Sequence, residues 1–271
     1  MSVWGASLVA LFTWWFATGI ILYVIRRADR TGGNAYNMAV FLSVPVLALG
    51  VAGVILSTAD AGLSGLFKGF FGALAIWGWI ELSFLSGVIT GPERADSPAG
   101  ASGSDRFWRA WDALAHHEIL LLTGMAFIVL ATSGSDNTIA MWTYAILFFA
   151  RISAKLNLFF GVPRINYEFL PLPLQHLRTH MTKGPVTAFF PISVTVLTFA
   201  VMCFVERLMS AGTPVDAIGF ALLTSLSALA LLEHWFMVIP LPDAKLWRWM
   251  LPDHSTRAQK RITAKEEANG L

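Results

Sequence analysis

The chain contains seven apolar stretches that are each long enough to cross a bilayer, and this feature restricts its fold more than any other. A helix needs about 20 mostly apolar residues to cross a hydrocarbon core about 30 Å thick. The sequence therefore predicts an all-α, polytopic membrane helix bundle with about seven transmembrane helices. We expect these helices near residues 3–25, 37–58, 69–91, 113–132, 139–160, 187–208 and 216–239.

The composition agrees with this expectation and excludes several other classes of protein. Hydrophobic residues make up 56% of the chain and charged residues 13%, which is too apolar for an ordinary soluble domain of this size. The single cysteine, Cys203, excludes an intramolecular disulfide and a cysteine zinc site. There is no GxGxxG or P-loop pattern, and we expect no nucleic-acid partner. The N-terminal apolar run reads as a retained first helix, because no basic region precedes it and no small-residue cleavage site follows it.

The basic residues predict an orientation for these helices. If the seven stretches alternate in direction, 17 of the 19 Lys and Arg residues fall on one side, and only Lys68 and Arg207 fall on the other. Basic residues favour the cytoplasmic side of a membrane, so we expect a periplasmic N-terminus and a cytoplasmic C-terminus. We expect residues 1–250 to form a single transmembrane domain. Within the chain, 163–183 is predicted to be an amphipathic segment on the cytoplasmic face, and 251–271 a polar cytoplasmic tail.

Ionisable residues in the apolar stretches are the candidates for function, because each one costs about 2.5–3.5 kcal/mol near the centre of a membrane helix. With the orientation above, they converge on the cytoplasmic half from four helices. One of them, Glu81, is expected about 15 Å from the end of its helix at 1.5 Å per residue. The candidates are Glu81, His116, His117, Glu118, Arg151, Lys155, Glu233 and His234.

Two of the uses open to this set involve a ligand. Carboxylates and imidazoles in a helix bundle can ligate iron or manganese, and the ligands would come from Glu81, His117, Glu118, Glu233 and His234. Alternatively, the neutral imidazole of His117 or His234 could coordinate the magnesium of a chlorophyll-type pigment or the iron of a haem, within a pocket of aromatic side chains.

A third use needs no ligand. Arg151 and Lys155 are spaced i, i+4 and share a helix face, so they can pair with Glu81 and Glu118. The histidines, including His116, would then bond to backbone or carboxylate groups, and the network would fix the packing of the helices.

A further pair, His176 and His180, has the i, i+4 spacing of the histidine boxes of membrane hydroxylases. Those boxes need about eight histidines, and this chain has 6. We therefore expect a basic segment that contacts lipid or a partner instead.

Six motifs are spread along the chain. They are "IELSFLSGVITGP" (80–92), "HHE" (116–118), "RISAKLNLFFGVP" (151–163), "EFLPLPLQHLRTH" (168–180), "FFPISV" (189–194) and "LEHWFMVIPLPDAKLWRW" (232–249). Together they resemble one family, the photosynthetic complex assembly protein family PuhE of purple phototrophic bacteria, and the resemblance covers nearly the whole chain. In that family a histidine often precedes the acid that matches Glu81, whereas this chain has Ile80, which argues against three equivalent His–Glu pairs.

The resemblance implies a protein of the bacterial cytoplasmic membrane, inner or intracytoplasmic, that supports assembly of the reaction centre and its light-harvesting complex. It implies photosynthetic complex subunits or pigment-synthesis proteins as partners, and bacteriochlorophyll as the ligand to consider for His117 or His234. We expect a non-enzymatic assembly factor. Two alternatives stay open: a di-iron or di-manganese membrane oxidoreductase acting on a pigment or carotenoid precursor, and a structural subunit of the mature complex.

The predicted orientation can be tested with reporter fusions after residue 62 and at the C-terminus. The first fusion should report the periplasm and the second the cytoplasm, because the basic residues should hold the connecting segments on the cytoplasmic side. A cytoplasmic signal after residue 62 would contradict the orientation.

Overall fold

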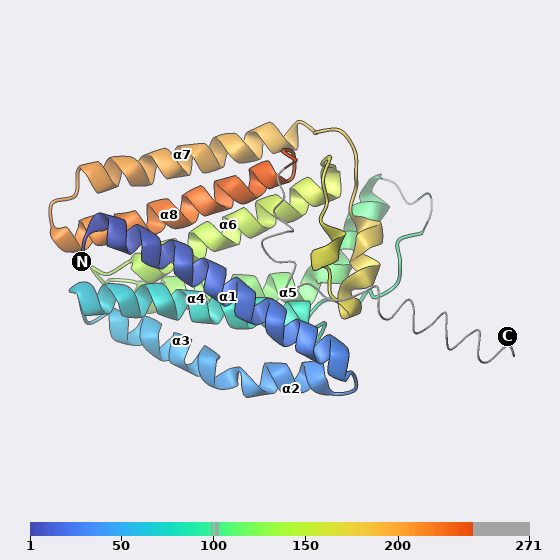
Figure 1. The fold of residues 1–271 in the computed structure, drawn as a ribbon, viewed down its shortest axis with the longest axis horizontal. Coiled ribbons are helices and arrows are strands. Elements are labelled where there is room, and N and C mark those ends of the chain that lie inside the picture. The colour runs from blue at the N-terminus through green and yellow to red at the C-terminus, as the bar shows by residue number, and fades with distance from the viewer. Residues whose placement is uncertain (99, 101–102, 241–271) are drawn as a thin grey trace, which may run out of the picture.

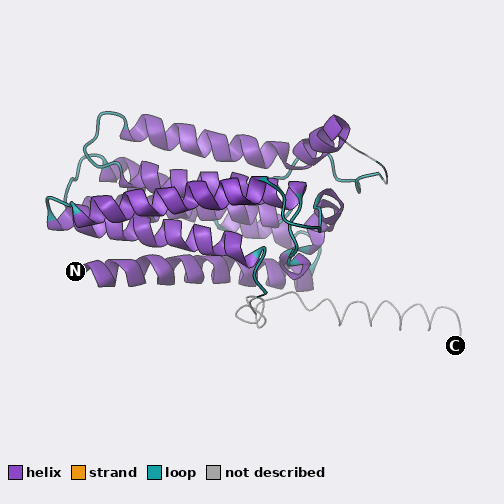
Figure 2. Cartoon of the chain, turned by 90° about the horizontal axis from the view of Figure 1, so that it is seen from above, coloured by secondary structure: helices purple, strands orange, loops and turns teal. Residues whose placement is uncertain are grey.

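The computed structural model describes residues 1–98, 100 and 103–240, and over these residues the regular elements are all helices, with no strand. The predicted 251–271 tail lies outside the described residues. Figure 2 shows the helices running side by side along one axis, as in a membrane bundle. The elements are α1 (Val3–Thr31), α2 (Ala35–Leu42), α3 (Val44–Ser57), α4 (Leu63–Leu85), α5 (Gly103–Thr132), α6 (Ile139–Phe160), η1 (Tyr167–Phe169), η2 (Leu172–His180), α7 (Phe189–Met209) and α8 (Pro214–Phe236).

Seven stretches of the described chain are long and apolar enough to span a membrane. The second span consists of α2 and α3 together and is broken at Ser43. Pro45 explains the break, because a proline in the first turn of a helix has no N–H to donate back to the preceding turn. The Ser43 hydroxyl donates to the Val40 carbonyl at 2.8 Å and so satisfies one of the carbonyls at the break.

Helices α4, α6 and α8 form the middle of the bundle. In each of these three helices, 44% of the residues in the most apolar 18-residue segment are buried. The share is 17% in α1 and in the span formed by α2 and α3, and 22% in α7. The peripheral helices are apolar on their exposed sides, as a surface in contact with lipid should be. Figure 1 shows that α1 begins beside α8 and crosses the bundle to end near α2, so that α1 and α8 separate toward the end of α8.

The third span differs from its expected position. It covers 63–85 instead of 69–91, and residues 86–91 form a turn. Gly87 explains this ending, because its φ of 73° is left-handed and an added Cβ would lie 2.4 Å from Pro173 Cβ. Glu81 therefore lies four residues, or about 6 Å, from the end of α4. The expectation of about 15 Å was wrong.

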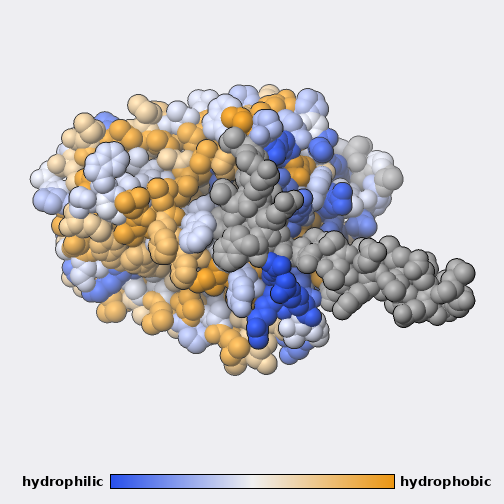
Figure 3. Space-filling view, viewed as in Figure 1, coloured by the Kyte–Doolittle hydropathy of each residue, from blue (hydrophilic) through white to orange (hydrophobic). Residues whose placement is uncertain are grey.

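Eleven of the thirteen Lys and Arg residues in the described chain lie on one side of the middle of the bundle, toward the end where α4, α6 and α8 finish and α5 begins. We call this the basic end. The exceptions are Lys68, in the second turn of α4, and Arg207, in the last turn of α7. On the face seen in Figure 3, apolar side chains cover the middle of the bundle and hydrophilic ones gather toward the right, where the basic end lies.

The most extensive helix contact in the described chain joins α3 to α4, and glycines make it possible. A Cβ added to Gly72 would lie 2.8 Å from the Val54 amide nitrogen and 2.9 Å from the Gly50 carbonyl oxygen. The two backbones thus approach as closely as they do in other small-residue helix pairs in membranes.

Replacing Gly72 with Ala should lower the free energy of unfolding by about 1–3 kcal/mol, because the new methyl group meets backbone atoms that cannot turn away. Gly78→Ala is the matched control on the same helix, because its Cβ would meet only Ile21 Cδ1, at 3.9 Å. That change should be neutral or raise stability by up to about 1 kcal/mol through helix propensity. Thermal unfolding of the two variants in detergent measures the difference, and equal stabilities would contradict this account of the contact.

Candidate functional site

Five of the candidate residues come together at the basic end. Glu81 lies near the end of α4, His117 and Glu118 lie in α5, and Arg151 and Lys155 lie in α6. We call these five residues the polar cluster. The helices bring them together because α4 and α6 finish at this end, where α5 enters the apolar part of the bundle (Figure 1).

The first link in the polar cluster is an ion pair between α4 and α6. Arg151 Nη2 donates a hydrogen bond to Glu81 Oε2 at 2.6 Å. The Glu81 side chain is 9% exposed and that of Arg151 34% exposed, so the pair extends from the interior of the bundle to its surface. An arginine suits this position because its delocalised charge is weakly hydrated and stays protonated.

A second ion pair joins α5 to α6. Lys155 Nζ donates to Glu118 Oε1 at 2.5 Å, and both side chains are largely buried. The ammonium also lies over the Phe84 ring, 5.5 Å from its centroid, where the ring face attracts a cation. Because Arg151 reaches α4 and Lys155 reaches α5, one face of α6 holds three helices together. Both pairs are those of the alternative in which the charges fix the helix packing.

His117 lies between the two pairs and is fully buried. Its ring stacks on Phe84 with 4.2 Å between centroids and 27° between planes, and its Nε2 is 3.8 Å from Glu81 Oε1. Neither ring nitrogen has a hydrogen-bond partner in the described part of the chain, and neither does Glu81 Oε1. Such orphan atoms are uncommon in protein interiors. A proton on Nε2 and a small shift would join His117 to Glu81.

The backbone near His117 is fixed by the turn that follows α4. The His117 amide donates to the Thr90 carbonyl at 2.9 Å. Gly91 allows this contact, because an added Cβ there would lie 1.9 Å from the Asp112 carbonyl oxygen. The end of α4 and the start of the apolar part of α5 are thus locked directly to each other.

His234 is buried in a separate position, where it joins α8 to α6. Its Nδ1 bonds to the Ala230 carbonyl at 2.8 Å and its Nε2 to the Ser153 hydroxyl at 2.9 Å. A carbonyl only accepts, so Nδ1 carries the proton and Nε2 accepts from Ser153. Sequence reasoning missed Ser153, because a lone serine in an apolar helix carries no pattern that would single it out. Asn157, one turn later, extends the seam by donating to Ser193 Oγ of α7 at 2.9 Å.

Two predicted members stay outside the polar cluster. His116 and Glu233 are both exposed, on the outer sides of α5 and α8. Successive residues on a helix point about 100° apart, and the packing of α5 and α8 turns His117 and His234 inward while His116 and Glu233 turn outward. Neither His116 nor Glu233 has a hydrogen bond or ion pair with the described residues, and the place of His116 in the network stays a prediction.

The arrangement bears on the two alternatives that need a ligand. Over the described residues, no group of three or more His, Cys, Asp or Glu side chains is placed to hold a metal ion. The two buried carboxylates face cations of the same chain, whereas metal ligands must converge on one point. A pigment also fits poorly, because the His117 ring is enclosed and both His234 nitrogens are engaged. The observed geometry thus favours helix packing over ligation.

The segment that was expected to be amphipathic, 163–183, contains two short 3₁₀ helices. Leu174 and Leu177 of η2 are buried in a cluster with Phe84 and Ala113, so η2 packs onto the ends of α4 and α5. His176 and His180 do not share a helix face, because four residues make one and a third turns of a 3₁₀ helix. Burial lowers the pKa of both imidazoles, so both are neutral at pH 7.

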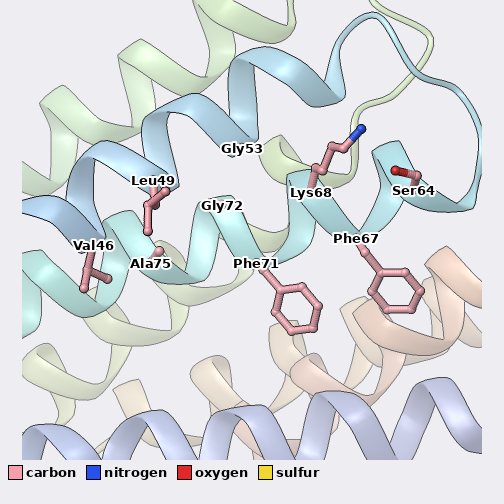
Figure 4. Close-up of a pocket in the computed structure, with 10 residues that line it drawn as sticks. Val46, Leu49, Gly53, Ser64, Phe67, Lys68, Phe71, Gly72 and Ala75 are labelled. Atoms are coloured by element: carbon pink, nitrogen blue, oxygen red, sulfur yellow. The ribbon is translucent and has the colours of Figure 1, made fainter.

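A groove of about 520 Å³ lies along α3 and α4, closer to the end opposite the polar cluster. Figure 4 shows Phe67 and Phe71 projecting from α4 away from α3, and Lys68 reaching toward the end of the groove. Only Ser64 and Lys68 give the lining polar side chains, and Lys68 already pairs with Asp60 at 3.3 Å. The groove suits an apolar chain by shape but has no chemistry of its own.

The chain was compared with known proteins. Residues 1–258 match the family described as "Protein of unknown function (DUF3623)". The chain is 49% identical over 249 residues to the "Uncharacterized 30.4 kDa protein in puhA 5'region" of Rhodobacter capsulatus, which covers 92% of this chain and 91% of the relative. No solved structure matches the chain. The family match therefore covers all seven spans.

Replacing Glu81 with Gln should lower the free energy of unfolding by roughly 2–4 kcal/mol, because it leaves the Arg151 charge without its partner. The double variant Glu81→Gln, Arg151→Gln should recover most of the loss. The control is the partly exposed pair of Glu93 and Arg109, 3.7 Å apart, where the same changes should cost much less stability. Unfolding in detergent measures all the variants, and additive losses at Glu81 and Arg151 would contradict the pairing.

Proposed function

The chain belongs to the family described as "Protein of unknown function (DUF3623)", and within that family we propose that it serves as an integral membrane assembly factor for the bacterial photosynthetic reaction centre and its light-harvesting complex. It acts by binding protein partners and is not an enzyme. We further propose that it corresponds to the PuhE family, which its motifs resemble.

Two observations from sequence similarity support this setting. The sequence motifs from 80–92 to 232–249 resemble a family of photosynthetic complex assembly proteins. The relative from Rhodobacter capsulatus is named for its place in the 5′ region of puhA. The two names share the puh prefix, so the resemblance and the relative lead to the same group of genes.

The observation that carries the non-enzymatic part of the proposal is the neutralisation of the buried charges within the chain. Glu81 and Glu118 are each bound to a cation of α6. A metal-dependent oxidoreductase needs carboxylates and imidazoles that face one ion with an open position for substrate. A bundle whose charges hold its own helices together instead presents a stable outer surface, and its exposed ends and faces are left for partners.

Deleting the chain from a purple phototrophic bacterium should lower the near-infrared absorbance of its photosynthetic complexes severalfold per unit of membrane protein. No chemically modified pigment precursor should accumulate, because the protein performs no step of pigment synthesis. Absorbance spectra of membranes and chromatography of extracted pigments measure both quantities. Re-expression of the natural chain should restore the complexes, and so should Glu206→Gln, a change at an exposed acid that lies at the opposite end of the bundle.

Two results would contradict the proposal, each in favour of a different alternative. Accumulation of one discrete pigment or carotenoid precursor would favour the enzyme. Recovery of the chain at a fixed ratio to mature reaction centres would favour a structural subunit of the finished complex.

A further inference from the structure

Glu233 is an acidic residue within a membrane span, and the packing of the chain does not explain its presence there. It lies in the last turn of α8, three residues before the helix ends at Phe236. The side chain is exposed and has no hydrogen bond or ion pair with any described residue. A carboxylate in this position is costly in lipid and needs a partner or a function.

Every other acidic side chain within the seven spans has a partner. Glu81 and Glu118 bind Arg151 and Lys155. Asp216, near the start of α8, accepts a hydrogen bond from the Thr213 hydroxyl at 2.7 Å, and Glu206, near the end of α7, accepts one from the Ser210 hydroxyl at 3.3 Å. Asp29 accepts a hydrogen bond from the Tyr36 hydroxyl. Glu233 is therefore distinguished by its lack of a partner.

No cation of the described chain neutralises Glu233. Arg151 is near enough to act on it electrostatically, but its guanidinium already binds Glu81 at 2.6 Å. Turning Arg151 toward Glu233 would break that pair and leave the buried Glu81 carboxylate uncompensated, which costs more than it gains. The missing cation must come from elsewhere.

The surroundings of Glu233 indicate what kind of partner brings the cation. Leu232, Trp235 and Ile239 are exposed beside it, by 44%, 38% and 40%. Leu232 and Trp235 lie on one side of α8, and Glu233 lies at the edge of this apolar stripe. A stripe of this kind within a membrane span suits lipid or another membrane helix, and the carboxylate beside it favours a helix that supplies a cation. Figure 1 shows α1 separating from α8 toward this end of the bundle.

The depth of Glu233 in the membrane favours a partner helix that carries a basic side chain. It lies at the basic end, where this chain carries most of its own Lys and Arg residues. Membrane proteins in general concentrate Lys and Arg at the cytoplasmic ends of their helices. A neighbouring helix in the same orientation would thus place a cation at the depth of the Glu233 carboxylate.

We infer that the exposed end of α8 and the turn after it, with Leu232, Glu233, Trp235 and Ile239, bind a transmembrane helix of another protein that carries a Lys or Arg at the same depth, and that this cation pairs with Glu233. The inference rests on the proposed function only for the existence of a membrane partner. It adds the docking surface and the chemistry of the helix that docks there.

Photo-crosslinking in native membranes tests the inference. A photoreactive amino acid replaces Leu232 in the full chain, and the adducts are mapped by mass spectrometry. The expected adduct joins Leu232 to a transmembrane helix of a different protein, within about two turns of a Lys or Arg. In the Glu233→Gln background its yield should fall roughly tenfold or more, because the ion pair is lost. Glu233→Asp should keep most of the yield, and Glu206→Gln should keep all of it.

Charge reversal provides the second readout. Glu233→Lys should abolish the adduct, and replacing the mapped Lys or Arg of the partner with Glu should restore it. The purified Glu233→Gln chain should unfold at the natural temperature, since Glu233 has no partner within the described bundle. A clear loss of stability in that variant would make the carboxylate a packing residue and would overturn the inference.

Three other outcomes would overturn it as well. These are adducts confined to this chain itself, including its segment 241–271, adducts with lipid alone, and a protein adduct whose yield does not depend on Glu233. The proposed function is judged separately, by the yield of photosynthetic complexes after deletion. A charge-dependent adduct with normal complex yield would refute the assembly role alone, whereas a fall in complex yield with an adduct that ignores Glu233 would refute the docking surface alone.

Discussion

The ion pair between Glu81 and Arg151 is the interaction on which the rest of this end of the bundle depends. It joins two of the three most buried helices, α4 and α6, at a depth where neither charge could remain alone. The i, i+4 spacing then places Lys155 on the same face of α6, where it draws Glu118 and with it α5 into the same assembly. Two charges on one helix thereby position three helices.

Different contacts join the helices in the middle of the bundle and near its ends. In the middle, α3 and α4 approach through Gly50 and Gly72, so that contact depends on close backbone packing. At the basic end ion pairs are added to the packing, and His234 with Ser153 adds a hydrogen bond between α8 and α6. At the opposite end Asn137 donates hydrogen bonds to the Ser57 and Asp60 carbonyls. Lipid explains the division, because packing joins apolar helices in the middle of a membrane, whereas polar groups near the interface must find partners.

The sequence predicts much of this arrangement because apolar length and charge spacing are local properties. All seven spans were expected close to where they lie, and the spacing of Arg151 and Lys155 was enough to suggest their acidic partners. The end of α4 was missed because residues 86–91 are as apolar as the helix before them. Only the left-handed Gly87, against Pro173, ends the helix there.

Which side of a helix faces inward could not be read from neighbouring residues. His116 and His117 are chemically identical in sequence, and only the packing of α5 on α4 decides that His117 is buried. His234 likewise found Ser153, a residue 81 positions away that no local pattern indicates.

The same geometry explains why an acid and a histidine stand side by side near the end of α8. A helix turns by about 100° per residue, so adjacent residues can meet different surroundings. His234 points inward and fixes α8 to α6, while Glu233 points outward beside Leu232 and Trp235. The inward residue makes α8 rigid, and rigidity lets the outward residue hold a defined position. A charge on a mobile helix would lose more entropy on binding. The internal hydrogen bonds of His234 and the exposed Glu233 carboxylate therefore both contribute to the proposed docking surface.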